Sequence, residues 1–264
     1  MDMFGLKSLL ICALIFIPLE RLFSLRPQQI FRKGIVNDLI YATFNGGIVN
    51  LLAGLMLAPA INAGALLIPM SLTNAISGQP TWLQVIEIII LTDLGVYFIH
   101  RAFHAIPALW RFHSIHHAVD EMDWLVGFHL HPVDLFVSKS LTLIPVFLLG
   151  FTTEALGIYF VIYLGHTLLI HSNVKMNFGP FKWLIVSPQL HHWHHANERA
   201  AYDKNFAGQL AIIDAIFGTF NLPGDEAPQK YGVDDPIPKN YFGQVGYPLV
   251  PRQNLPKRPA PGGG

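Results

Sequence analysis

The sequence has little charge and almost no cysteine. Only 13% of its 264 residues are Asp, Glu, Lys or Arg, and the formal net charge is zero, so nothing indicates a nucleic-acid partner. The single cysteine, Cys12, excludes an intrachain disulfide. It also excludes a metal site built from several thiolates, such as a structural zinc or an iron–sulfur cluster. An HExxH motif is missing as well, and with it the zinc-peptidase arrangement of two ligands and a glutamate base.

Apolar residues make up 52% of the chain and gather in long, nearly uncharged runs. Several runs approach the roughly 20 residues that cross a bilayer core as a helix. The sequence therefore predicts an all-α fold, an integral membrane helical bundle. The runs extend over Leu6 to Pro18, Ile35 to Pro59, Val85 to Ile99, Leu135 to Phe151 and Ala155 to Ile170.

The first apolar run could also be a secretory signal. Its basic start is weak, with only Lys7, and it continues into Leu19-Glu20-Arg21-Leu22 without a small-residue cleavage site. These features favour a membrane helix over a signal peptide.

Basic residues are unevenly spread between the runs. Residues 61–82 contain no Lys or Arg, whereas four basic residues follow the first run, at Arg21, Arg26, Arg32 and Lys33. Loops rich in Lys and Arg face the cytoplasm, and the last two runs can go out and back as a hairpin that turns near residues 150–154. All 13 histidines fall between His100 and His195. This topology places all of them on or near the cytoplasmic face.

The histidines occur in clusters with helical spacing. On a helix over residues 93–104, Asp93, Tyr97, His100 and His104 fall within about 60° of one another, so both imidazoles can reach one metal ion and the other two groups can hold the rings by hydrogen bonds. An HxxHH pattern then occurs twice, with its three histidines at i, i+3 and i+4. The two patterns are His113, His116, His117 and His191, His194, His195.

Three clusters of this kind are enough for two metal ions. Polar residues at membrane depth are costly and tend to be functional, whereas a lone histidine near the interface is usually a hydrogen-bonded structural residue. We assign that structural role to His129 and His192. Clustered neutral imidazoles suit zinc, copper, iron or nickel, and many nitrogens with few carboxylates suit a pair of redox-active irons.

Several motifs together resemble a known family, the membrane-bound fatty acid hydroxylase/sterol desaturase superfamily. The resemblance covers roughly Leu83 to Leu222, more than half of the chain. The motifs, in chain order, are DLGVYFIHRAFH, HSIHH, HLHPVD, HSNV and PQLHHWHH, followed by DKNF and DAIFGTF. It implies a histidine-held, non-haem di-iron centre that activates O2 and attacks unactivated C–H bonds of lipids.

Matched position by position, the resemblance implies nine iron ligands. They are His100, His104, His113, His116, His117, His171, His191, His194 and His195. A tenth ligand could be either of two further histidines, His131 or His166. Asp93, Asn173, Asp203 and Asn205 also match the pattern; they would hold the ligands or their helices in place, or have plain structural roles. Tyr97 is a further candidate for holding a ligand, from its place on the helix face of His100 and His104. Where many relatives carry Arg and Glu around the His-Pro pair, this chain has His129 and Asp134, which puts a fixed role for these two positions in doubt.

The resemblance also divides the chain into three parts. We expect N-terminal transmembrane helices over residues 1–82, a di-iron catalytic domain over residues 83–222, and an irregular, largely disordered tail over residues 223–264. The part of this tail from Pro251 onward has no periodic pattern and should be disordered.

The implied activity is O2-dependent hydroxylation or desaturation of a lipid of the sterol, fatty-acyl, ether-lipid or isoprenoid type. The chain has no CxxC motif, no GxGxxG motif and no recognisable haem-binding domain. We therefore expect a separate electron donor, a cytochrome or ferredoxin with its reductase. An intracellular bacterial membrane is the expected location, with the metal site on the cytoplasmic side.

Two other classes remain open. A histidine-rich metal-transport or metal-binding membrane protein would have similar composition, although its histidines should follow a path through the membrane rather than gather at one face. A zinc-dependent membrane hydrolase is disfavoured because no HExxH base or nucleophile arrangement is evident.

Overall fold

The structure is a computed structural model that describes residues 5–224 and 226–251. Within these ranges the chain is helical, apart from loops and two isolated β-bridges that join Ser24 to Val174 and Ala196 to Tyr231. The predicted all-α fold is confirmed.

Among the described residues, three helices are long and apolar enough to cross a membrane: α5 (Thr81–Ala105), α7 (Pro132–Leu149) and α8 (Thr153–His171). Helices α7 and α8 form the predicted hairpin. Its turn begins at Gly150, which has a positive φ of 80° that glycine adopts without steric cost, and it ends at Thr152, whose side chain caps the first turn of α8.

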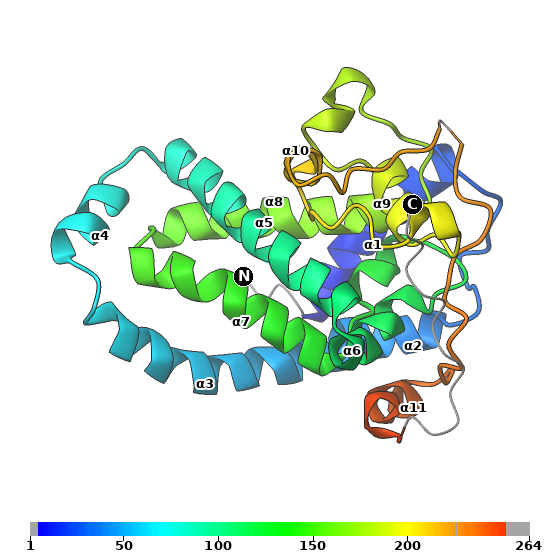
Figure 1. Ribbon diagram of the computed structural model, residues 1–264, viewed down its shortest axis with the longest axis horizontal. Coiled ribbons are helices and arrows are strands. Elements are labelled where there is room, and N and C mark those ends of the chain that lie inside the picture. The colour runs from blue at the N-terminus through cyan, green and yellow to red at the C-terminus, as the bar shows by residue number, and fades with distance from the viewer. Residues whose placement is uncertain (1–4, 225, 252–264) are drawn as a thin grey trace.

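The two N-terminal runs are also helical. Helix α1 covers Leu6–Leu22, and the second run continues as helix from Ile35 to Ala65, six residues beyond its predicted end. A π-helical turn, η1 (Tyr41–Asn45), separates α2 (Ile35–Ile40) from α3 (Gly46–Ala65). A further helix, α4 (Met70–Ser77), lies in the connection to α5; it lies at the opposite end of the bundle from α6 and α9 (Figure 1).

The outer surface of the bundle is apolar. Large hydrophobic side chains on the long helices are exposed in the isolated chain, among them Leu14 on α1, Leu55 on α3, Ile90 on α5, Leu141 on α7 and Val161 on α8. Such extended apolar surfaces mark contact with a membrane or a partner. Together with the three membrane-capable helices, they define a membrane protein.

Proline begins each of the two helices that carry the HxxHH patterns. Helix α6 (Pro107–His117) and helix α9 (Pro188–His194) both begin with proline at their first position. A residue before proline avoids the helical region, so Ile106 is extended with φ −95° and ψ 114°. Helix α5 ends there, and α6 packs back against it.

Short helices complete the chain and bring its last part onto the bundle. They are η2 (Trp124–Phe128), η3 (Gly179–Trp183), η4 (Arg199–Ala201), α10 (Ala211–Ile216), α11 (Tyr241–Gly246) and η5 (Tyr247–Leu249).

The segment after Leu222 is more ordered than its composition indicated. The side chains of Tyr231, Tyr241 and Tyr247 are buried, and Tyr241 packs edge-on against Tyr41 at 4.9 Å between ring centroids. Aromatic burial against the bundle therefore fixes a segment that we expected to be irregular. Residues 252–264, expected to be disordered, lie outside the described residues. The division of the chain at residues 82 and 222 stays a prediction.

Candidate metal centre

The nine histidines implied as ligands come together in two groups. Within each group, every residue offers a ring nitrogen that lies within 4.8 Å of those of the others. Five histidines form the first group: His100, His104, His113, His117 and His194. Four form the second group: His116, His171, His191 and His195.

Each HxxHH pattern is divided between the two groups. Neighbouring residues on a helix point about 100° apart, so His116 contributes to the second group while His117 contributes to the first. The same division separates His195 from His194. The rings of His117 and His195 stack at 4.5 Å between centroids, which places the two groups side by side.

The hydrogen bonds fix which ring nitrogen carries the proton. A backbone carbonyl can only accept, so the Nδ1 atoms of His171 and His116 donate to the carbonyls of Thr167 at 2.7 Å and of His129 at 3.1 Å. The Nε2 atoms of these two rings then face each other at 3.2 Å, each with a lone pair. Two lone pairs at that distance repel unless a cation lies between them.

The spacing of the other nitrogens fits metal ligation equally well. The Nε2 atoms of His100 and His113 are 2.9 Å apart in the first group, as are those of His171 and His191 in the second. Two metal–imidazole bonds of about 2.1 Å at a right angle would place their nitrogens about 3.0 Å apart. The residues present therefore fit a pair of imidazole-bound metal ions.

Burial keeps the rings in the form that binds metal. Desolvation, with the neighbouring imidazoles, holds the pKa values of His116, His117, His191 and His195 well below their ordinary value. These rings are neutral at pH 7, and a neutral imidazole offers the lone pair that a metal needs.

The DKNF loop orients rings from two helices through its backbone. The carbonyl of Lys204 accepts from His194 Nδ1 and that of Phe206 accepts from His100 Nδ1, both at 2.8 Å. The Oδ1 atom of Asp203 lies 3.4 Å from His104 Nδ1. Asp203 and Asn205 have left-handed φ angles of 57° and 58°, a conformation that Asp and Asn tolerate better than most residues. The role of Asp203 in holding a ligand ring stays a prediction.

Two buried carboxylates hold this loop in place. Asp93 accepts from the backbone N–H groups of residues 208, 209 and 210 at 2.6–3.0 Å. Asp214 accepts from the N–H groups of Phe206 and Ala207 at 2.7 and 2.9 Å. Asp93 was expected to hold ligand rings by hydrogen bonds; its carboxylate instead accepts from backbone N–H groups just after the loop. Asp214 was not among the predicted residues, although it begins the DAIFGTF motif.

Asp134 is a second residue whose contact with a ligand ring was not predicted from the sequence. Its Oδ2 atom accepts from His113 Nδ1 at 2.7 Å, and both side chains are buried. Asp134 therefore orients the ring of His113, although the motif comparison had put a fixed role for position 134 in doubt. Asp134 lies in the first turn of α7, but its partner is 21 residues earlier and could not be identified from spacing.

The remaining candidates make contacts of other kinds. His131 caps α7, accepting from the Val133 N–H at 3.0 Å, and His166 bonds to the Val186 carbonyl at 2.9 Å; neither belongs to the two groups of described residues. The Tyr97 hydroxyl lies 3.1 Å from Thr219 Oγ1, and Asn173 bonds to the backbone of Arg26.

The two histidines assigned structural roles are hydrogen-bonded outside the groups. His192 lies between the Tyr231 hydroxyl, at 2.7 Å, and the Ser172 carbonyl, at 3.0 Å. His129 bonds to Asp38.

A largely apolar cavity of about 740 Å³ adjoins both groups. His100 and His113 of the first group and His171 of the second are among its lining residues. It follows α8 from His171 to Gly157, a distance of about 21 Å at about 1.5 Å per residue. Gly157 and Gly54, on α3, are both lining and exposed, so the cavity reaches the outer surface of the bundle.

These features define a class, a helical membrane protein with a two-part histidine centre beside an apolar cavity. The family follows from comparison with known proteins: residues 85–219, just over half of the chain, match the family model described as fatty acid hydroxylase. The chain belongs to this family.

The names of its relatives describe enzymes that act on lipids or long-chain aldehydes. An ornithine lipid hydroxylase (OlsE) of Rhizobium tropici is 31% identical over 176 residues, which cover 64% of this chain and 51% of the relative. The human alkylglycerol monooxygenase is 30% identical over 145 residues, or 55% and 32% of the two chains. A rice very-long-chain aldehyde decarbonylase (GL1-7) is 26% identical over 146 residues, or 51% and 22%. The chain thus spans about half of the first relative and a third or less of the others. No solved structure matches it.

Proposed function

We propose that this protein is a membrane-bound, non-haem di-iron oxidoreductase that uses O2 to hydroxylate or desaturate a lipid. The observation that carries the proposal is that one apolar cavity borders both histidine groups. An alkyl chain in that cavity would bring its carbons next to both metal positions. The names of the relatives support a lipid substrate.

The residues of the chain have distinct tasks in this proposal. Bound irons would supply O2 activation and removal of hydrogen from carbon. The nine imidazoles would hold the two ions, while Asp134 and the DKNF loop carbonyls fix the orientation of His113, His100 and His194. The apolar walls would exclude water and position the alkyl chain.

We infer that the metal centre faces the cytoplasm, in a bacterial inner membrane. The segment after α1, which carries Arg26, Arg32 and Lys33, and α6, which carries Arg111, lie toward the histidine end, whereas residues 61–82, which include α4 at the far end, contain no Lys or Arg (Figure 1). Positively charged segments favour the cytoplasmic side. A soluble cytochrome or ferredoxin with its reductase could deliver electrons to this face.

Metal content tests the proposal directly. Protein expressed in iron-supplemented medium and purified in detergent should contain about two irons per chain, coupled in the Mössbauer spectrum of the oxidised form. With an electron-donor system and O2, it should convert a lipid in membranes of the host. Zinc alone after anaerobic reconstitution with iron would contradict the proposal, and metal flux into vesicles would favour the transporter.

The cavity gives a prediction about substrate access. Gly157→Trp should lower lipid turnover by about tenfold or more, because crowding an occupied site costs about 1–3 kcal/mol, while iron content stays at the wild-type value. A Cβ at Gly157 meets open space, so the folded protein can accept the larger side chain at this position. Turnover and iron content are measured on the same preparations.

Gly165→Trp provides the matched control. Gly165 lies on the same helix, is exposed and also has open space around its Cβ, but it does not line the cavity. Equal losses of turnover in both variants would contradict a role of the cavity in lipid access.

A further inference from the structure

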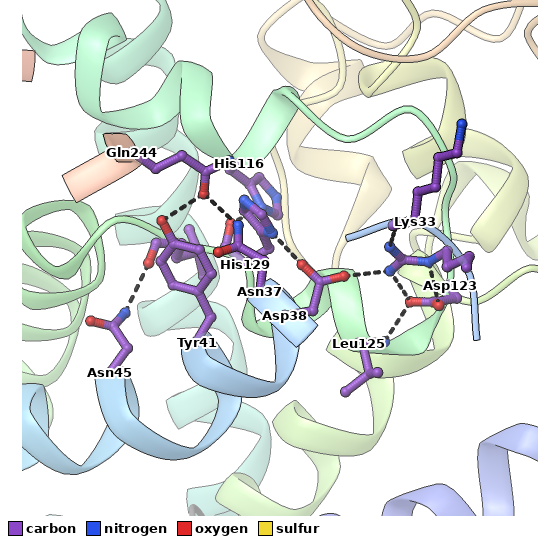
Figure 2. A network of polar contacts seen from close by, with 12 residues as sticks. Lys33, Asn37, Asp38, Tyr41, Asn45, His116, Asp123, Leu125, His129 and Gln244 are labelled. Carbon is purple, nitrogen blue, oxygen red and sulfur yellow. Dashed lines mark hydrogen bonds and ion pairs between the residues drawn. The ribbon is translucent and has the colours of Figure 1, made fainter. Parts of the chain in front are cut away.

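One ring of the second histidine group, that of His116, bonds to the backbone carbonyl of His129. The His129 side chain is in turn held by a residue that lies outside residues 85–219, the region that matches the family. His116 Nδ1 donates to the backbone carbonyl of His129 at 3.1 Å. The His129 side chain is 4% exposed and bonds through Nδ1 to Asp38 Oδ1 (Figure 2). Asp38 belongs to α2, whereas the family match begins at residue 85.

Asp38 is one member of a buried charged network. Arg32 donates to both oxygens of Asp123, at 2.6 and 2.7 Å, and to Asp38 Oδ2 at 2.6 Å. Asp123 in turn accepts from the Leu125 N–H at 3.0 Å and caps η2, the short helix that leads to His129 (Figure 2). Arg32 and Asp38 thus hold the 123–129 segment at its start and at its end.

The π-helical turn and α11 complete the enclosure of this segment. Asn45 donates to the Leu130 carbonyl at 2.8 Å, and the Tyr41 ring lies 4.4 Å from that of His129. The Tyr41 hydroxyl reaches Gln244 of α11 at 2.9 Å (Figure 2). A π-turn places Tyr41 and Asn45 on the same side toward this segment, and such turns are frequent at functional sites.

We propose that Asp38 is a positioning residue for the second histidine group and acts through His129. The inference rests on the proposed metal function. Taking two carboxylates and a guanidinium out of water is costly, and apolar side chains could fill the same volume at least as stably. The network here instead fixes a carbonyl that orients a metal-binding ring. Partners of this kind typically contribute about 10–100-fold in metal affinity.

The test is an anaerobic Fe²⁺ titration of full-length, metal-free protein in detergent, with a competing chelator. Asp38→Asn should weaken one of the two binding steps by about 10–100-fold and leave the other unchanged. Mössbauer spectra at limiting iron should then show isolated rather than coupled ions. Asn37→Ala is the matched control, since Asn37 directly precedes Asp38 on α2 and its side chain donates to Gln244. Both of its binding steps should stay within about twofold of the wild type.

A second pair of variants tests the connection through His129. His129→Gln keeps a side-chain N–H for Asp38 and should retain both binding steps, whereas His129→Leu should match Asp38→Asn. Unchanged binding in Asp38→Asn and His129→Leu, or equal weakening of both steps with a lowered melting temperature, would overturn the inference. If the wild-type protein itself fails to bind two irons, the proposed function is at fault instead.

Discussion

Replacing His194 by alanine should abolish lipid oxidation and remove at least one iron per chain. His194 belongs to the first group, and its Nδ1 bond to the Lys204 carbonyl fixes its Nε2 toward the other four rings. Losing a ligand should cost more than the about 10–100-fold typical of residues that only support one. Iron content by elemental analysis and O2-dependent product formation by mass spectrometry measure the two effects.

The matched control lies two residues away in the same motif. His192→Gln should keep its iron, because the His192 ring bonds to Tyr231 and to the Ser172 carbonyl and belongs to neither group. An active, fully loaded His194→Ala protein would remove His194 from the ligand set. Loss of iron in both variants would indicate that general damage to α9 is the cause.

Replacing Asp134 by asparagine should weaken iron binding or activity by about 10–100-fold. The Asp134 carboxylate accepts from His113 Nδ1 at 2.7 Å, which keeps the proton on Nδ1 and leaves Nε2 free for the metal. An asparagine lacks the negative charge and can present an N–H group to the ring instead, which would favour the wrong tautomer. An anaerobic Fe²⁺ titration should place the loss on a single binding step.

Ser138→Ala is the control for Asp134→Asn, because it changes the packing of α7 beside Asp134 but keeps the negative charge of that carboxylate. The Ser138 hydroxyl donates to the other oxygen of Asp134 at 3.1 Å, so its removal keeps the carboxylate and its bond to His113. We expect at most a few-fold change in affinity. Wild-type affinity in Asp134→Asn would show that the neighbouring rings alone orient His113.

Local patterns predicted the helices and the histidines. Long uncharged runs and the i, i+3, i+4 spacing depend only on helix periodicity, which the sequence contains directly. The predicted run from Val85 to Ile99 lies within α5, and the run from Ala155 to Ile170 lies within α8. The nine histidines matched to the family motifs are the nine that come together, although their role as ligands stays a prediction.

Long-range contacts could not be predicted in this way. Helix geometry lets neighbouring histidines of an HxxHH pattern point to different sides. Which histidine joins which group depends on the rings that other helices bring beside it, and spacing does not indicate this. The contact between Asp38 and His129 joins residues 91 positions apart, and no periodicity indicates it. The order of residues 226–251 likewise depends on aromatic packing against a surface formed elsewhere in the chain.

The position of Gly157 has a consequence for how turnover is measured. The cavity reaches the outer surface at this residue, which lies on a membrane-capable helix. A lipid that enters there comes from the bilayer, so the quantity that sets the rate is its mole fraction among the surrounding amphiphiles rather than its amount per volume of buffer. Adding inert detergent at constant total substrate should therefore slow the reaction by surface dilution, and a Michaelis constant has meaning only on a two-dimensional scale.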